Sequence, residues 1–259
     1  MLIDSHCHLC DEAFRPVLGQ KLALWAAQGG PGRYLSQSAQ PDDWPRQEAI
    51  RGAFPDRVQI AIGLHPQWAG LEPCDDARLN ALIDRMKVVL LRNPGAWIGE
   101  IGLDFAEPRF KAHEALQRKI LAAQLDLAEE LGRPVMLHAR KSAAAVHAMI
   151  RRRTKLRGCL HGSSEGAQIL KLFLGEGFLI GAGSVLLYEP SPRKFAEAAA
   201  QLPDDGYCLE TDSPFMSFRG QNEPTRIARI VRIVANLRGQ SPQDVEESAT
   251  RNISRLLSF

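Results

Sequence analysis

Residues 134–161 read PVMLHARKSAAAVHAMIRRRTKLRGCLH, and this stretch contains the repeating unit of the fold. The short apolar runs at 135–138 and 158–161 are typical of buried strands, and residues 142–152 between them have helical periodicity. A strand, a helix and a second strand in this order predict a parallel β-α-β unit. Each strand of this unit is predicted to end on a histidine.

The same alternation recurs along the chain. We predict eight strands, at residues 2–4, 33–36, 58–64, 96–101, 135–138, 158–161, 178–181 and 207–211. Helices are predicted at 109–131, ended by Gly132 and Pro134, at 142–152, at 225–237 and at 243–257, which Ser241 caps. Eight such units predict an α/β fold, a TIM-type (β/α)8 barrel with an extra C-terminal helix, built as a single domain over residues 1–259.

The composition limits the classes of partner. The 259 residues carry a net charge of +2, from 32 basic and 30 acidic side chains, which is too small for a general polyanion-binding protein, so any contact with DNA would be local. The five cysteines form an odd set with one C-x-x-C pair, Cys7 and Cys10, which favours reduced thiols and a cytoplasmic location. No apolar run in the sequence reaches the roughly 18 residues that cross a membrane, and nothing in it indicates an obligatory protein partner.

The segment Asp4-Ser5-His6-Cys7-His8 follows the first predicted strand. In an extended backbone, side chains two positions apart point the same way, so His6 and His8 are expected to converge on one point. Imidazoles are common metal ligands, which makes the pair a candidate metal site. Two solvent-exposed histidines would give the same pattern.

Further residues of the metal-ligand type end other predicted strands, namely Glu100, His138, His161 and Asp212. The carboxyl ends of all strands share one face of a parallel barrel, and active sites lie on that face. These groups would be costly to bury together without a cation, and six ligands exceed the four of one tetrahedral ion. We therefore predict two divalent ions, of Mg, Mn or Zn, held by His6, His8, Glu100, His138, His161 and Asp212.

Two of these residues are also predicted to be catalytic. Glu100 is the candidate bridge between the two ions. A divalent cation lowers the pKa of a bound water to about 7, and a neighbouring carboxylate can orient that water and shuttle its proton. Asp212 is predicted to be this carboxylate.

Three side chains are predicted to face the substrate. His65 ends the third strand and can donate to a phosphate or carbonyl oxygen, although a hydrogen-bonded core histidine fits the sequence equally well. Arg140 and Lys141 follow His138 directly, so both would stand on the catalytic face and could neutralise a phosphate. Arg109 and Arg219 are weaker candidates for the same role.

Six segments resemble the TatD family of metal-dependent deoxyribonucleases, which belong to the amidohydrolase-like barrels; they are residues 4–9, 63–66, 99–104, 134–140, 161–163 and 210–214. The resemblance implies a distorted β/α barrel that binds two divalent ions through the six residues named above and hydrolyses phosphodiesters in DNA. The chain departs from the family pattern from Gly162 to Glu165, directly after His161. The contacts of that loop are therefore left open.

Two other functions remain open on the sequence alone. The same metal site could cleave a small amide, ester or lactone, because barrels of this kind change substrate through their loops. The protein could also bind metal or a partner without turnover. The intact carboxylate of Asp212 argues against this second alternative.

Overall fold

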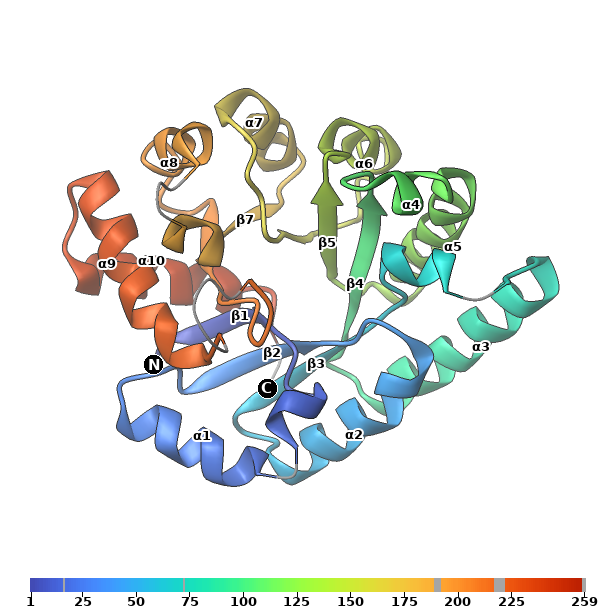
Figure 1. The fold of residues 1–259 in the computed structure, drawn as a ribbon, viewed down its shortest axis with the longest axis horizontal. Coiled ribbons are helices and arrows are strands. Elements are labelled where there is room, and N and C mark those ends of the chain that lie inside the picture. The colour runs from blue at the N-terminus through green and yellow to red at the C-terminus, as the bar shows by residue number, and fades with distance from the viewer. Residues whose placement is uncertain (16, 72, 189–191, 217–221, 258–259) are drawn as a thin grey trace.

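The computed structural model describes residues 1–15, 17–71, 73–188, 192–216 and 222–257. Within these ranges, eight strands form one parallel sheet in sequential order, which confirms the predicted barrel. The strands are β1 (Ile3–Cys7), β2 (Arg33–Gln37), β3 (Val58–Ile62), β4 (Trp97–Asp104), β5 (Val135–Arg140), β6 (Gly158–Leu160), β7 (Leu179–Ala182) and β8 (Tyr207–Leu209). Figure 1 shows the strands in the middle of the molecule with the helices around the outside.

Helices connect successive strands and cover the outer surface of the sheet. The described α-helices are α1 (Leu18–Ala27), α2 (Trp44–Ala53), α3 (Asp76–Arg92), α4 (Pro108–Lys111), α5 (Glu114–Leu131), α6 (Ala143–Ile150), α7 (Ala167–Gly175), α8 (Arg193–Ala199), α9 (Ile227–Arg238) and α10 (Pro242–Ser254). Short 3-10 turns are η1 (Glu12–Phe14), η2 (Pro41–Asp43), η3 (Pro66–Gly70), η4 (Ser184–Leu187) and η5 (Pro224–Arg226). Among the described helices, none combines the length and the apolar composition that a membrane crossing requires.

The interior of the barrel is filled by side chains from every strand. One buried residue from each strand contributes to this layer: Ile3, Leu35, Ala61, Trp97, Met136, Cys159, Leu179 and Cys208. Ile253 of the C-terminal helix α10 packs against the same layer, with Leu256 and Leu257 beside it. The centre is therefore a packed core, so a substrate must approach from one end of the barrel.

Side chains of β1 join the first strand to the last. Ser5 Oγ donates to the backbone oxygen of Leu209 at 2.9 Å. The carboxylate of Asp4 accepts bonds from the backbone N (2.9 Å) and the hydroxyl (2.6 Å) of Thr211. Past the end of β8, the backbone N of Asp212 donates to His6 O at 2.8 Å. These bonds place the segment after β8 directly beside β1.

The predicted helix over residues 109–131 is two helices in the structure, because a turn at 112–113 separates α4 from α5. Gln117 of α5 is buried and binds both backbone groups of Asp104: the side-chain oxygen accepts from the backbone N at 2.8 Å and the amide donates to the backbone O at 3.2 Å. This pair of bonds holds the start of α5 at the end of β4. The predicted end of the helix is confirmed, since Gly132 adopts the left-handed conformation of a C-cap.

Candidate metal centre

The first group of predicted ligands gathers around β1. His6 and His8 are buried, and their Nε2 atoms lie 3.3 Å apart. Each Nε2 also lies 3.4 Å from Oε2 of Glu100 and 3.4 Å from Oδ1 of Asp212. We call these four residues the first cluster.

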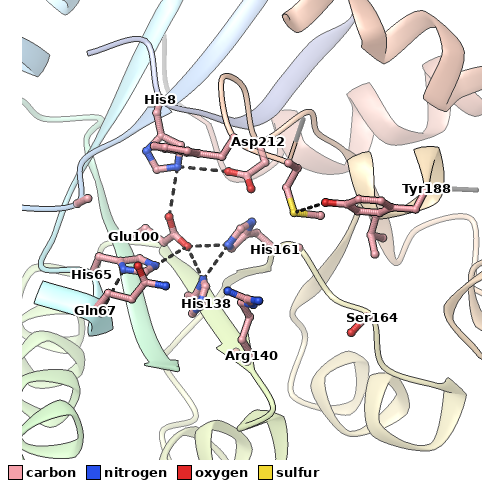
Figure 2. Close-up of a pocket in the computed structure, with 16 residues that line it drawn as sticks. His8, His65, Gln67, Glu100, His138, Arg140, His161, Ser164, Tyr188 and Asp212 are labelled. Carbon is pink, nitrogen blue, oxygen red and sulfur yellow. Dashed lines mark hydrogen bonds and ion pairs between the residues drawn. The ribbon is translucent and has the colours of Figure 1, made fainter. Parts of the chain in front are cut away.

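A second group lies on the other side of Glu100. Its Oε1 lies 2.7 Å from Nδ1 of His138 and 2.6 Å from Nε2 of His161, and these two nitrogens are 3.3 Å apart. We call Glu100, His138 and His161 the second cluster. Figure 2 shows the Glu100 carboxylate between His8 on one side and the two imidazoles of this cluster on the other. One oxygen of Glu100 therefore serves each cluster.

Two of the predicted ligands lie where the strand register is irregular. Over residues 4–7, β1 contains one residue more than the segment of β2 that pairs with it, and over residues 98–101, β4 contains one residue more than β5. A bulge of this kind changes the direction of side chains and is common beside active sites. His6 lies in the first irregular segment and Glu100 in the second. Both predicted ligands lie inside strands that run further than predicted.

The donors of both clusters fit divalent cations. In each cluster, two imidazole nitrogens face one another at 3.3 Å and also face the same oxygen of Glu100. Two ring nitrogens that point at one position are well satisfied when a cation accepts both lone pairs. Imidazole nitrogen and carboxylate oxygen are ligands that zinc and manganese accept. The structure brings all six predicted ligands together, in two groups that share one carboxylate.

The ionised groups of the site stabilise one another. Burial opposes the charged form of His8, but Asp212 and Glu100 raise its pKa to about 10. Burial also opposes charge on His138, whose pKa Asp104 and Glu100 raise to about 9. Burial alone would raise the pKa of Glu100, yet the surrounding imidazoles lower it well below its usual range. A cation that binds here would therefore displace protons from the imidazoles.

Asp104, the last residue of β4, contacts His138 from behind. Its Oδ2 lies 3.2 Å from His138 Nε2 and accepts a hydrogen bond from Gln67 at 2.8 Å. Because Nε2 faces this carboxylate, Nδ1 is the atom directed at Glu100. Sequence reasoning assigned Asp104 no role. It could have been found, since residues 100 and 104 of one extended strand face the same side once β4 is known to reach Asp104.

A cavity of about 600 Å³ is lined by members of both clusters, namely His8, Glu100, His138, His161 and Asp212. Its lining includes the polar side chains of Gln67, Arg140 and Ser164 and the aromatic side chains of Tyr188 and Phe215. Figure 2 labels Gln67, Arg140, Ser164 and Tyr188 around the clusters. The Arg140 side chain is half exposed and lies 3.8 Å from the Asp104 carboxylate. Arg140 is therefore placed to meet a ligand in the cavity.

The other predicted substrate contacts lie differently. His65 lines the cavity, but its Nδ1 accepts from the backbone N of Gln67 at 3.2 Å, so its Nε2–H points at Glu100, 3.3 Å away. Lys141 is exposed and is not among the residues that line the cavity. Arg109 is also exposed and pairs with Glu107. Arg219 lies outside the described residues.

The loop that follows His161 borders the cavity. Gly162 and Ser164 line it, and the backbone N of Gly162 donates to Oε1 of Glu210 at 2.7 Å. Glu165 points instead to Lys194 of α8, which donates to it at 2.9 Å. The segment that departs from the family pattern thus supplies part of the cavity wall.

Known proteins share this architecture along the whole chain. The family model described as TatD related DNase matches residues 3–258. The metal-dependent hydrolase YjjV of Escherichia coli is 31% identical, over 99% of this chain and 97% of its own. The deoxyribonuclease TATDN3 of Homo sapiens is 26% identical, over 98% of this chain and 94% of its own. The crystal structure of YjjV, a TatD homologue, superposes with a TM-score of 0.88 at 28% identity and covers 100% of this chain and 98% of that one. With a matching family model over nearly its full length and paired histidine and carboxylate clusters at the mouth of its barrel, the chain belongs to the TatD-related DNase family and is a metal-dependent hydrolase.

Proposed function

We propose that this chain is a deoxyribonuclease that hydrolyses phosphodiester bonds, and that its two clusters, which share Glu100, would each hold a divalent cation. The observation that carries the proposal is the division of the Glu100 carboxylate, whose Oε2 faces the first cluster and whose Oε1 faces the second. Two adjacent cations are a recurrent device for phosphodiester hydrolysis. The likeness to proteins named deoxyribonucleases supports DNA as the substrate.

The residues of the site have different roles in the proposed reaction. When bound, the cations would supply Lewis acidity toward a phosphate and acidify a water. Asp212 lines the cavity, and bonds from His6 and His8 lower its pKa against the opposing effect of burial, so it is ionised at neutral pH. It can therefore accept a hydrogen bond from the attacking water and orient it. His65 holds the Glu100 carboxylate, which both clusters share, through its Nε2–H.

Arg140 is proposed to bind the phosphate of the substrate. Arg140 lines the cavity, and charge-assisted hydrogen bonds from arginine suit phosphate oxygens. With a net charge of only +2, binding would depend on such local contacts and not on the overall field of the protein.

The test compares substrates on the purified protein. Labelled single-stranded and double-stranded DNA would be incubated with Mg²⁺, Mn²⁺ or Zn²⁺, beside panels of small esters, amides and lactones. Release of nucleotides that stops with chelator and with Asp212→Asn is the expected result. The matched control is Asp126→Asn, because Asp126 is an exposed carboxylate that pairs with Arg153 on the outer surface. Turnover of small esters or amides alone would contradict the DNase proposal, and metal-loaded protein that is inert on every panel would contradict an enzymatic role.

We further propose the cytoplasm as its compartment. Cys7, Cys10, Cys74, Cys159 and Cys208 are all free thiols in the structure. Reduced cysteines are the usual state in that compartment. Fractionation of cells that express the tagged protein would test this, and recovery in the periplasmic fraction would contradict it.

A further inference from the structure

Glu210 is a buried carboxylate directly after β8, and it has no role in the proposed catalysis. It is 1% exposed. Its Oε1 accepts one hydrogen bond, from the backbone N of Gly162, and within the described residues its Oε2 has no hydrogen-bond partner. A buried carboxylate normally has its oxygens satisfied by donors. Oε2 of Glu210 can therefore accept a hydrogen bond from a neighbouring donor.

Strand β7 and Gly183, which directly follows it, leave space for this side chain. A Cβ atom at Gly181 would lie 2.2 Å from Oε2 of Glu210, and one at Gly183 would lie 2.5 Å from its Cγ. Both contacts are closer than real Cβ atoms allow. Any larger residue at either position would push the carboxylate away, so its placement depends on the two glycines.

The rings of His6 and His161 lie beside this carboxylate. They stack on one another, with centroids 3.6 Å apart and planes 5° from parallel. One ring nitrogen of each and one oxygen of Glu210 lie within 4.8 Å of one another, and Nδ1 of His161 lies 3.9 Å from Oε1. Within the described part of the chain, Nδ1 of both rings is buried without a hydrogen-bond partner.

The two rings belong to different clusters. Nε2 of His6 faces the first cluster and Nε2 of His161 faces the second. A neutral imidazole that gives the lone pair of Nε2 to a cation carries its proton on Nδ1. Each ring then has one buried N–H donor, and Glu210 is the carboxylate beside both. A rotation of the rings or of the carboxylate would bring these N–H groups within hydrogen-bond distance of Glu210.

We propose that Glu210 is a positioning residue shared by both cation sites: it fixes the Nδ1–H tautomer and the orientation of His6 and of His161 at once. The inference rests on the two-cation site proposed above. It differs from the role of Asp104, which contacts the ring of His138 alone. A cation held by Glu210 itself is disfavoured, because it would need ring nitrogens that carry protons when Nε2 is a ligand.

The experiment measures metal uptake, not hydrolysis. Chelator-treated protein would be titrated calorimetrically with Mn²⁺, and its Co²⁺ form would be examined by visible absorption. Wild type is expected to take up two equivalents. Glu210→Gln is expected to weaken both by about 10–100-fold, the usual cost of losing such a partner, and to change the Co²⁺ bands. The matched control Glu197→Gln, an exposed residue of α8, should titrate like wild type.

A second variant displaces the carboxylate without removing it. Gly183→Ala should weaken both equivalents in the same direction, while Gly52→Ala, whose added Cβ meets nothing within 4 Å, should leave them unchanged. The inference is overturned if Glu210→Gln and Gly183→Ala weaken neither site or only one. It is also overturned if wild type binds three equivalents and Glu210→Gln binds two. A wild type that takes up no cation would refute the two-cation function itself, which separates that failure from this one.

Discussion

Asp104 Oδ2 and His138 Nε2 lie 3.2 Å apart, on the side of the imidazole opposite the Nδ1 atom that faces Glu100. This contact decides which nitrogen of His138 is presented to Glu100. Burial would raise the pKa of Asp104, but bonds from His138 and Gln67 lower it below its usual range, so the carboxylate is ionised. A charged acceptor behind a ligand makes the ring a better donor to a cation.

Asp104→Asn should therefore weaken one cation site. The amide nitrogen of asparagine would face the donors of His138 or Gln67, and the ring would lose its fixed orientation. We expect the affinity of the second cluster to fall about 10–100-fold while the first cluster keeps its affinity. Calorimetric titration with Mn²⁺ would measure this, with Asp126→Asn as the surface control. Two unchanged equivalents would show that the contact does not tune the ligand.

The metal-free protein should lose stability as pH rises. The pKa values of His8, about 10, and of His138, about 9, lie above the ordinary value near 6.5. A raised folded pKa contributes stability that is complete below about pH 6.5 and is lost as pH rises through the folded value. For the metal-free protein in chelator, the urea midpoint should fall between pH 7 and pH 9. For the protein with two equivalents of Zn²⁺ and no chelator, the midpoint should fall less, because neutral rings then serve as ligands. His8→Asn should flatten the chelator curve, and a wild-type midpoint that stays level would contradict the argument.

Arg238, at the end of α9, should be important for folding stability. Its guanidinium is nearly buried, donates to the backbone oxygens of Ala199 and Leu202 at 3.2 and 2.6 Å, and lies over the Tyr207 ring. Arg238→Ala should lower the free energy of unfolding by about 2–3 kcal/mol, because it removes charged hydrogen bonds and leaves carbonyls unpaired. Urea denaturation would measure the loss. Arg193→Ala, at an almost fully exposed arginine, should stay within about 0.5 kcal/mol of wild type.

Much of the fold follows from local pattern, but the strand ends do not. Apolar runs place all eight strands, and the residues that close them predict which side chains meet at the mouth of the barrel. The runs cannot show that β1 continues through His6, because the polar residues Asp4 and Ser5 follow Ile3. They cannot show that β4 continues to Asp104, because Gly102 interrupts the apolar pattern. The register irregularities at residues 4–7 and 98–101 depend on pairing with a neighbouring strand. Only the folded sheet shows them.

The supporting carboxylates were missed for a related reason. Asp104 contacts a residue 34 positions away, and Glu210 contacts Gly162, which is 48 positions away. A single sequence does not show which distant residue an acidic side chain contacts. Lys141 is a case in which the sequence suggests a contact that the structure does not have. Its position beside Arg140 suggests a shared role, yet of these two residues only Arg140 lines the cavity. Adjacent residues at the end of a strand point in different directions, and the turn that follows decides which one reaches the site.

Arg140 and Lys141 therefore provide a matched pair for the substrate site. Arg140→Ala should raise KM for a DNA substrate about 10–100-fold, the equivalent of one or two charge-assisted bonds to a phosphate. The slope of log KM against log salt should fall by about one, because one phosphate contact is lost. Lys141→Ala removes the same charge one residue away, outside the cavity, and should change KM by less than about twofold. Both variants should still bind two equivalents of Mn²⁺. Equal effects of the two substitutions would mean that the loop acts through its general positive field, and an unchanged KM in Arg140→Ala would place the phosphate on another wall of the cavity.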